Sequence, residues 1–147
     1  SCARRKKAEA AEGLSHSTVN CILQDSKGFV WIGTQDGLDR YDGYRFEVYK
    51  HDPADPTSLP SDWINVLAED PSGDLWIGTE GGGLLRWHRD GGRFTRLQHR
   101  GDDPTSLSGD RVRALRIDSQ GVLWVGTFDS GLNRLDTQSG VIERFRH

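Results

Sequence analysis

The sequence predicts an all-β fold assembled from three copies of one unit. The tetrapeptide Trp-Ile-Gly-Thr occurs at 31–34 and again at 76–79, and Trp-Val-Gly-Thr follows at 124–127. The copies are therefore spaced by 45 and 48 residues. Glycine accounts for 18 of the 147 residues and proline for five, a balance that favours many tight turns. A unit of this length that repeats along the chain is typical of stacked supersecondary structures.

Within the first unit, the hydrophobic pattern is that of β-strands. Apolar residues alternate with other residues from Val19 to Gln24, over a stretch too short for a stable helix. An Asp-x-x-Gly turn follows at Asp25 to Gly28, where the aspartate can accept backbone hydrogen bonds and the glycine can adopt positive φ. This segment therefore predicts one strand and the turn that ends it.

Three further strands complete the unit. Phe29–Ile32 is apolar on both alternating faces, which indicates a strand covered on both sides. A turn at 35–37 separates it from a strand at Leu38–Tyr41, and a turn at 42–43 precedes a strand at Tyr44–Tyr49. Each unit is predicted to be a four-stranded antiparallel meander, and the units are expected at residues 14–58, 59–106 and 107–147.

A four-stranded sheet with two apolar faces is not stable alone and must stack on its neighbours. Repeats of ~40–50 residues with four strands each are typical of β-propeller blades, and a linear solenoid is the alternative arrangement. Propellers usually carry ~4–8 blades. Three blades therefore predict a partial propeller that lacks further blades, or a ring closed by homo-oligomerisation.

Residues 1–13 lie outside the repeat and are charged and rich in alanine. We expect a disordered leader, which is either an expression remnant or the tail of a removed targeting region. The chain has no methionine, which suggests a piece of a longer protein. Its net charge of −3 argues against nucleic-acid partners, and no apolar run is long enough for a membrane span.

The repeated unit resembles the two-component regulator propeller repeat. Its shared pattern is Asp-x-x-Gly, then Trp-Ile-Gly-Thr, then Gly-Leu-x-Arg and an aromatic strand, and the first copy reads VNCILQDSKGFVWIGTQDGLDRYDGYRFEVYKHDPADPTSL. The resemblance implies a non-catalytic ligand-sensing or interaction propeller in a bacterial signal-transduction receptor. It also implies a periplasmic location.

Two alternative functions remain open at the level of the sequence. One is a propeller lyase or hydrolase related to antibiotic-cleaving lyases, and the other is a purely structural, self-assembling propeller scaffold. The five histidines show no paired metal spacing, and no nucleophile elbow or phosphate loop is present. The two cysteines match no zinc spacing. The sequence therefore predicts no catalytic residue, no metal ligand and no cofactor.

Residues that recur in all three units are expected to serve the fold. The recurring tryptophans are predicted to fill the space between blades; they are Trp31, Trp76 and Trp124. The recurring arginines are predicted to pair with a recurring carboxylate, such as the turn aspartates, and a charged lining of the pore is the alternative. The arginines are Arg40, Arg86 and Arg134, and the turn aspartates are Asp25, Asp70 and Asp118.

Ligand-binding residues are expected where the copies differ, in loops held by the rigid sheets. If the first strand of each unit lines the channel, as the resemblance implies, the loops before the first strand and after the second share one rim. The candidate rim residues are Gln35, Asp36, Trp63, Glu80, Arg111, Phe128 and Asp129. Aromatic side chains beside carboxylates and an amide suit a small molecule or an oligosaccharide, through stacking and hydrogen bonds.

Overall fold

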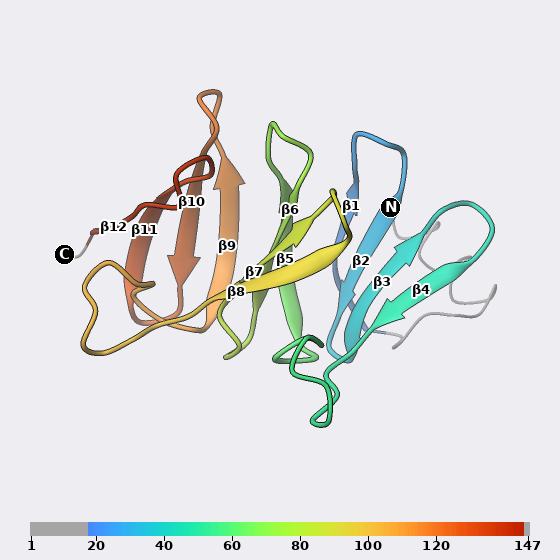
Figure 1. The fold of residues 1–147 in the computed structure, drawn as a ribbon, viewed down its shortest axis with the longest axis horizontal. Helices are drawn as coiled ribbons and strands as arrows, with labels where there is room; N and C mark the ends of the chain where they lie inside the picture. Colours follow the sequence, from blue (N-terminus) through green and yellow to red (C-terminus); the bar gives the residue numbers. More distant parts are fainter. Residues whose placement is uncertain (1–17, 146–147) are drawn as a thin grey trace.

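The chain folds into three four-stranded antiparallel β-sheets, which confirms the all-β prediction (Figure 1). The computed structural model describes residues 18–145, and the leader expected at 1–13 lies outside them. None of the described residues forms a helix long and apolar enough to cross a membrane.

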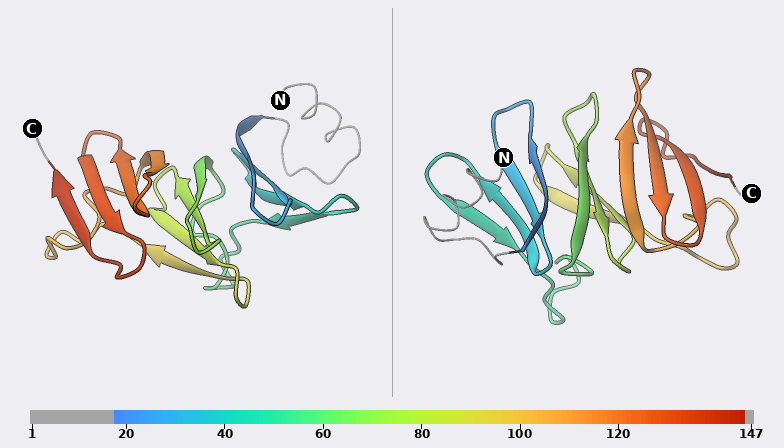
Figure 2. Two further views of the ribbon diagram at one scale, coloured as in Figure 1. Left: turned by 90° about the horizontal axis from the view of Figure 1, so that it is seen from above. Right: turned by 180° about the vertical axis from the view of Figure 1, so that it is seen from behind.

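Each sheet is a meander whose strands pair in chain order, and we refer to the sheets as blades 1, 2 and 3. Blade 1 consists of β1 (Val19–Gln24), β2 (Val30–Thr34), β3 (Gly37–Tyr41) and β4 (Phe46–Tyr49). Blade 2 consists of β5 (Ile64–Glu69), β6 (Leu75–Thr79), β7 (Leu84–His88) and β8 (Arg93–Leu97). Blade 3 consists of β9 (Val112–Ile117), β10 (Val122–Thr127), β11 (Gly131–Asp136) and β12 (Ile142–Phe145). Blade 2 lies between the other two, in an open row that does not close into a ring (Figure 2).

The fourth strand begins later than the sequence pattern indicates. It starts at Phe46 and not at Tyr44, because the turn before it is longer than two residues. Asp42 Oδ1 accepts hydrogen bonds from the N–H groups of Tyr44 (2.9 Å) and Arg45 (3.1 Å), which holds both residues in the turn. Tyr44 consequently points into solvent and is 95% exposed.

Two apolar layers hold the blades together. The layer between blades 1 and 2 contains the buried side chains of Trp31, Leu38, Leu59, Ile64, Leu75, Ile77, Leu85 and Trp87. The layer between blades 2 and 3 contains those of Trp76, Leu84, Leu107, Val112, Leu123, Val125, Leu135 and Ile142. Each layer also takes one leucine from the linker between its blades, so the linkers are anchored as well as the strands.

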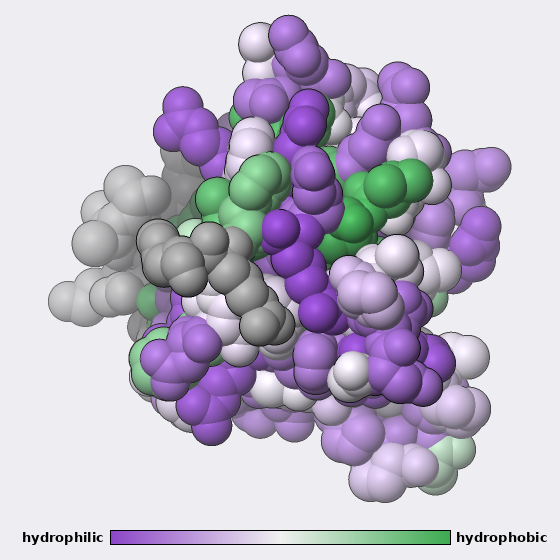
Figure 3. Space-filling view, turned by 90° about the vertical axis from the view of Figure 1, so that its left-hand side faces the viewer, coloured by the Kyte–Doolittle hydropathy of each residue, from purple (hydrophilic) through white to green (hydrophobic). Residues whose placement is uncertain are grey.

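The predicted place of the tryptophans is confirmed in two blades and wrong in the third. Trp31 and Trp76 are buried in the two layers, and Trp31 packs edge-on against Trp87 with ring centroids 4.8 Å apart. Trp124 is only half-buried. Its neighbours in β10 face blade 2, and because side chains alternate along a strand, Trp124 lies on the open face of blade 3. Figure 3 shows the end of the molecule beyond blade 3, where hydrophobic side chains lie among charged ones.

The turn aspartate of each blade binds the indole of the same blade's tryptophan. One carboxylate oxygen accepts the indole N–H. The other accepts the backbone N–H of the third residue of the Asp-x-x-Gly turn and that of the residue after its glycine. The three pairs are Asp25 with Trp31 (2.8 Å), Asp70 with Trp76 (2.9 Å) and Asp118 with Trp124 (3.2 Å).

The predicted pairing of the recurring arginines with these aspartates is wrong in blades 1 and 3. Arg40 and Arg134 form ion pairs with Glu47 and Glu143 across their own hairpins. Arg86 lies 3.6 Å from Asp70, but its shorter contact, 2.9 Å, is with Asp74. The arginine that binds Asp25 is Arg89 of blade 2, at 2.9 Å. The guanidinium groups of the three recurring arginines lie over the tryptophan rings.

The glycine of the Trp-x-Gly-Thr motif receives a side chain from the next blade. A Cβ atom placed on Gly33 would lie 2.6 Å from Cγ2 of Ile64, and one on Gly78 would lie 2.6 Å from Cγ1 of Val112. Such distances are far below van der Waals contact. A Cβ atom on Gly126 would meet its nearest neighbour at 3.3 Å, and that neighbour belongs to the same blade.

We expect Gly78→Ala to lower the free energy of unfolding by roughly 1–3 kcal/mol, because the added methyl group overpacks the layer between blades 2 and 3. Gly126→Ala is the matched control in the same motif, and we expect it to change stability by less than about 1 kcal/mol. Urea unfolding of both variants tests this. An equal loss in the two variants would contradict the role assigned to the glycine.

Candidate functional site

Four candidate residues form a row across blades 2 and 3, which we call the rim row: Trp63, Glu80, Arg111 and Phe128. The N–H of Glu80 donates to the carbonyl of Trp63 (3.0 Å), and the N–H of Phe128 donates to that of Arg111 (2.9 Å). Glu80 and Arg111 form an isolated antiparallel bridge that joins the two pairs. Since neighbouring strands lie about 4.8 Å apart, the row spans roughly 14 Å.

A glycine turn lets blade 2 approach blade 3 at this rim. The N–H groups of Gly81 and Gly83 donate to the carbonyl of Asp110, at 3.2 and 2.9 Å. Gly83 has a φ of 86°, and a Cβ atom there would lie 2.4 Å from the carbonyl oxygen of Leu97. Glycine is therefore required at this position, and the turn fixes the rim row across the blade boundary.

The carboxylate of Glu80 is the electrostatic centre of the rim. Arg113 donates to it twice, from Nε at 2.7 Å and from Nη2 at 2.8 Å, and Asn65 Nδ2 donates at 2.8 Å. The hydrogen bond from Arg113 lowers the pKa of Glu80, against the opposing effect of burial. The same hydrogen bond raises the pKa of Arg113, and the charge of Asp129 adds to that effect.

The remaining side chains of the rim row are open to solvent. Trp63 is 42% exposed and Phe128 is 43% exposed. The Arg113 and Arg111 guanidinium carbons lie 4.7 and 5.6 Å from the centre of the Phe128 ring. Arg111 reaches Glu80 only at 3.7 Å and keeps 57% of its side chain exposed. The row thus presents two aromatic surfaces and one guanidinium to solvent.

The structure does not bring every candidate residue into the rim row. Gln35 and Asp36 lie in the β2–β3 turn of blade 1, where Asp36 pairs with Lys50 at 3.0 Å. Asp129 follows Phe128 and has a φ of 66°, so its turn is strained for a residue other than glycine. Gln35, Asp36 and Asp129 flank the row and do not belong to it.

Two residues of the site were not predicted from the sequence, Asn65 and Arg113. They occupy the same repeat position as Asn20, near the start of each blade's first strand. Asn20 and Asn65 donate to backbone carbonyls of the next blade, at 2.8 and 3.1 Å, whereas Arg113 reaches back to blade 2. The change from asparagine to arginine in the third copy was the signal in the sequence.

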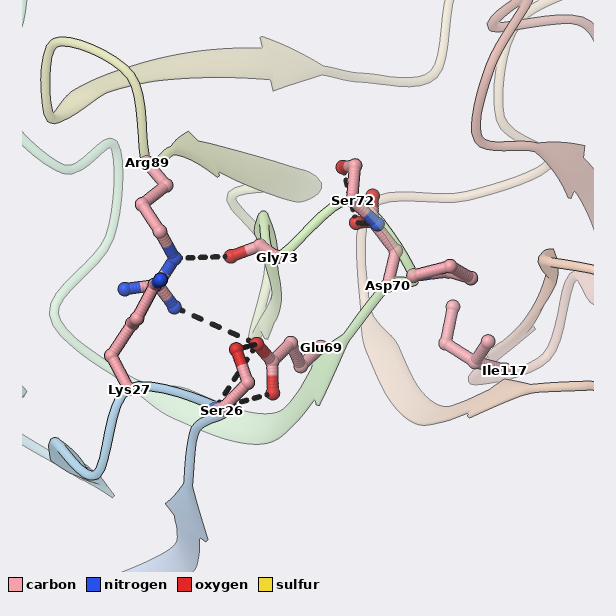
Figure 4. A pocket seen from close by; sticks show the side chains of 9 residues that line it. Ser26, Lys27, Glu69, Asp70, Ser72, Gly73, Arg89 and Ile117 are labelled. Carbon is pink, nitrogen blue, oxygen red and sulfur yellow. Dashed lines mark hydrogen bonds and ion pairs between the residues drawn. The ribbon is translucent and has the colours of Figure 1, made fainter.

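A hollow of about 470 Å³ lies at the end of the first strands opposite to the rim row (Figure 4). Arg89 spans it and donates to Asp25 Oδ2 at 2.9 Å and to the carbonyl of Gly73 at 2.8 Å. Glu69 accepts the N–H and hydroxyl groups of Ser26 from blade 1. These polar groups bind one another between blades, so we assign this hollow to the packing of the fold.

The lowered pKa of Glu80 predicts a pH-dependent contribution to stability. A carboxyl group whose pKa is lower in the folded than in the unfolded protein stabilises the fold at pH values above its unfolded-state pKa. This stabilisation is lost as the pH falls through its folded-state pKa. We expect Glu80→Gln to melt at a lower temperature than the unmodified chain at pH 7, and this difference to shrink under acidic conditions. Thermal melts across a pH series measure it, and a difference independent of pH would contradict the assignment.

Comparison with known proteins matches the family described as two component regulator propeller at residues 13–36, 58–81 and 106–129. The chain is 48% identical over 48 residues to Histidine kinase P4 of Formosa agariphila, an alignment that covers 33% of this chain and 4% of the kinase. No group of three or more side chains able to hold a metal ion occurs among residues 18–145.

Solved structures show the same fold. The extracellular domain of the putative hybrid two component system BT3049 from B. thetaiotaomicron is similar over 93% of this chain and 19% of that one, with a TM-score of 0.86 and 30% identity. A virginiamycin B lyase from Staphylococcus aureus is similar over 88% of this chain and 41% of that one, with a TM-score of 0.62; at 21% identity, that likeness shows the fold alone. The repeats, the three blades and these matches agree, and the chain belongs to the two-component regulator propeller family.

Proposed function

We propose that this chain is part of a non-catalytic, extracytoplasmic ligand-sensing propeller of a bacterial signal-transduction receptor. The observation that carries the proposal is the likeness to the extracellular domain of BT3049, a putative hybrid two component system, over 93% of the chain. The match to a histidine kinase supports the same class of receptor. More specifically, we propose that this part of the receptor lies in the periplasm. The chain spans only about a fifth of the BT3049 domain, so the sensing unit is larger than these three blades.

The rim row is the proposed ligand-binding surface. Exposed aromatic side chains can stack on sugar rings or other flat ligands, and Arg111 can donate hydrogen bonds to acceptors between them. Glu80 is held by Arg113 and Asn65, so it serves to fix the geometry of the row. The proposed ligand is a small molecule or an oligosaccharide, and the negative net charge of the chain supports the absence of nucleic-acid partners.

The absence of catalysis is also a proposal, supported by where the histidines lie. His51 and His99 bind linker carbonyls through Nδ1, at 2.6 and 2.7 Å, and His88 lies at the end of β7 beside Thr95. In the described part of the chain, no histidine contacts the rim row. A lyase or hydrolase with a histidine base at this rim therefore has no support from residues 18–145.

We expect Trp63→Ala and Phe128→Ala to abolish ligand binding without a change in melting temperature, because both rings are exposed and outside the core layers. The assay is the shift in melting temperature on addition of a panel of soluble oligosaccharides, since a ligand that binds only the folded state stabilises it. Tyr44→Ala is the matched control, because Tyr44 is exposed on blade 1 away from the rim row. Full binding by both rim variants would refute this site.

The open faces of blades 1 and 3 are proposed to be covered by further blades or by a second copy of the chain. Ile22 and Val48 on blade 1, and Leu132 and Phe145 on blade 3, are each at least 40% exposed. We expect a stable dimer or trimer in light scattering across a concentration series if copies assemble. A monomer at all concentrations would contradict self-assembly, and further blades would then be the proposed cover of the open faces.

A further inference from the structure

The two linkers between blades have the same sequence motif and the same conformation. Asp-Pro-Thr-Ser-Leu occurs at 55–59 and at 103–107. In both copies the serine Oγ lies within hydrogen-bond distance of the carbonyls three and six residues earlier, at 2.8 and 3.1 Å. In both, the threonine N–H donates to the aspartate side chain at 2.9 Å. The linkers are therefore two instances of one preformed backbone structure.

The second linker holds an arginine side chain. Arg144 Nε donates to the carbonyl of Ser106 at 2.8 Å, and its Nη2 lies within hydrogen-bond distance of the carbonyls of Asp103 (3.0 Å) and Leu107 (3.1 Å). The same Nη2 lies 2.9 Å from the Ser106 hydroxyl. The converging carbonyls of this linker thus form a receptor for a guanidinium group, and a charged donor strengthens each of these hydrogen bonds.

The first linker offers the same receptor, but the chain does not fill it with its own arginine. Arg96 is the equivalent of Arg144, because it pairs with Leu85 of β7 as Arg144 pairs with Asn133 of β11. Its Nε donates instead to the carbonyl of Gly82, at 2.9 Å. The first linker borders a hollow of about 410 Å³, and Arg96 lies in its wall.

The walls of this hollow suit an arginine side chain. Leu85 and Phe94 supply apolar surface for its methylene groups, and the linker from Asp52 to Leu59 supplies oxygen acceptors. Asp52 stands where the second linker has Arg100, since the N–H of each donates to the linker serine hydroxyl. Asp52 and Asp55 together outnumber Arg96, the cation in the wall of the hollow, so the charge favours a further cation. The first linker is therefore more negative than the one that already holds a guanidinium.

We propose that the hollow beside the first linker is a binding site for an arginine side chain presented by another polypeptide segment. The carbonyls of Asp55, Ser58 and Leu59 receive its guanidinium in the way that their counterparts receive Arg144. A polypeptide is the occupant because the side chain that fills the second linker comes from a β-strand, β12. This site is independent of the rim row and does not rest on ligand sensing there.

Peptide titration followed by NMR of the full chain tests this site. The probe is acetyl-Gly-Arg-Gly-amide, with the citrulline and lysine versions as matched controls. We expect saturable shifts of the backbone amides of Thr57, Ser58 and Leu59, with a dissociation constant on the order of millimolar for one anchored side chain. We expect no saturation with citrulline and at least several-fold weaker binding with lysine. Absent saturation at the first linker, or equal shifts at both linkers, would overturn the proposal.

Two substitutions sharpen the test in opposite directions. Arg144→Ala empties the second linker, and we expect the same peptide then to produce a new set of saturable shifts at Ser106 and Leu107. Asp52→Arg copies the charge of the second linker, and we expect it to weaken binding at the first linker several-fold. Unchanged affinity in Asp52→Arg would refute the charge argument and with it the site, whether or not Arg144→Ala folds.

Discussion

The hydrogen bond from the tryptophan indole to the turn aspartate is the interaction on which the rest of each blade depends. It ties the Asp-x-x-Gly turn to β2, the strand on which the inter-blade layer is centred. Burial works to raise the pKa of Asp25, but the hydrogen bonds from Trp31, Arg89 and the backbone outweigh it and lower that pKa. Because these hydrogen bonds compensate for its burial, the Asp25 carboxylate remains charged inside the protein at neutral pH. It orients the indole, and the indole in turn supports the next blade.

The fold could be predicted from the sequence because every feature that defines it recurs. A strand pattern seen three times in register leaves little choice of structure, and the apolar faces of β2 and its equivalents require stacking. The partners of the recurring arginines could not be predicted. Two oppositely charged residues at a constant spacing suggest a pair. The sequence does not reveal that Glu47 and Glu143 lie directly opposite Arg40 and Arg134 on the neighbouring strand, or that Asp25 receives its arginine, Arg89, from the next blade. Trp124 is less buried than Trp31 and Trp76 because Leu123 and Val125 face blade 2, so Trp124 lies on the open face of blade 3.

The site was predicted in part, for a related physical reason. Divergence between copies located Trp63, Glu80, Arg111 and Phe128 in loops, and backbone hydrogen bonds across the blade boundary place all four in one row. The copies also diverge inside the strands, where Arg113 stands in place of Asn20 and Asn65. This substitution changes the contacts between blades: the asparagine forms a hydrogen bond to the next blade, whereas the arginine forms an ion pair with the previous blade.

The arginines show how one scaffold separates structure from function. Where an arginine serves the fold, its donors are consumed by backbone carbonyls or its guanidinium covers an indole, as with Arg144 and Arg86. Arg111 instead lies on an exposed rim with its nearest carboxylate at 3.7 Å. An exposed ion pair at that distance contributes little to stability, so the fold alone gives no strong reason for an arginine there. The same reasoning applies to the first linker, whose preformed acceptors receive no arginine from their own blade. Both places are positions at which the copies of the repeat differ from one another.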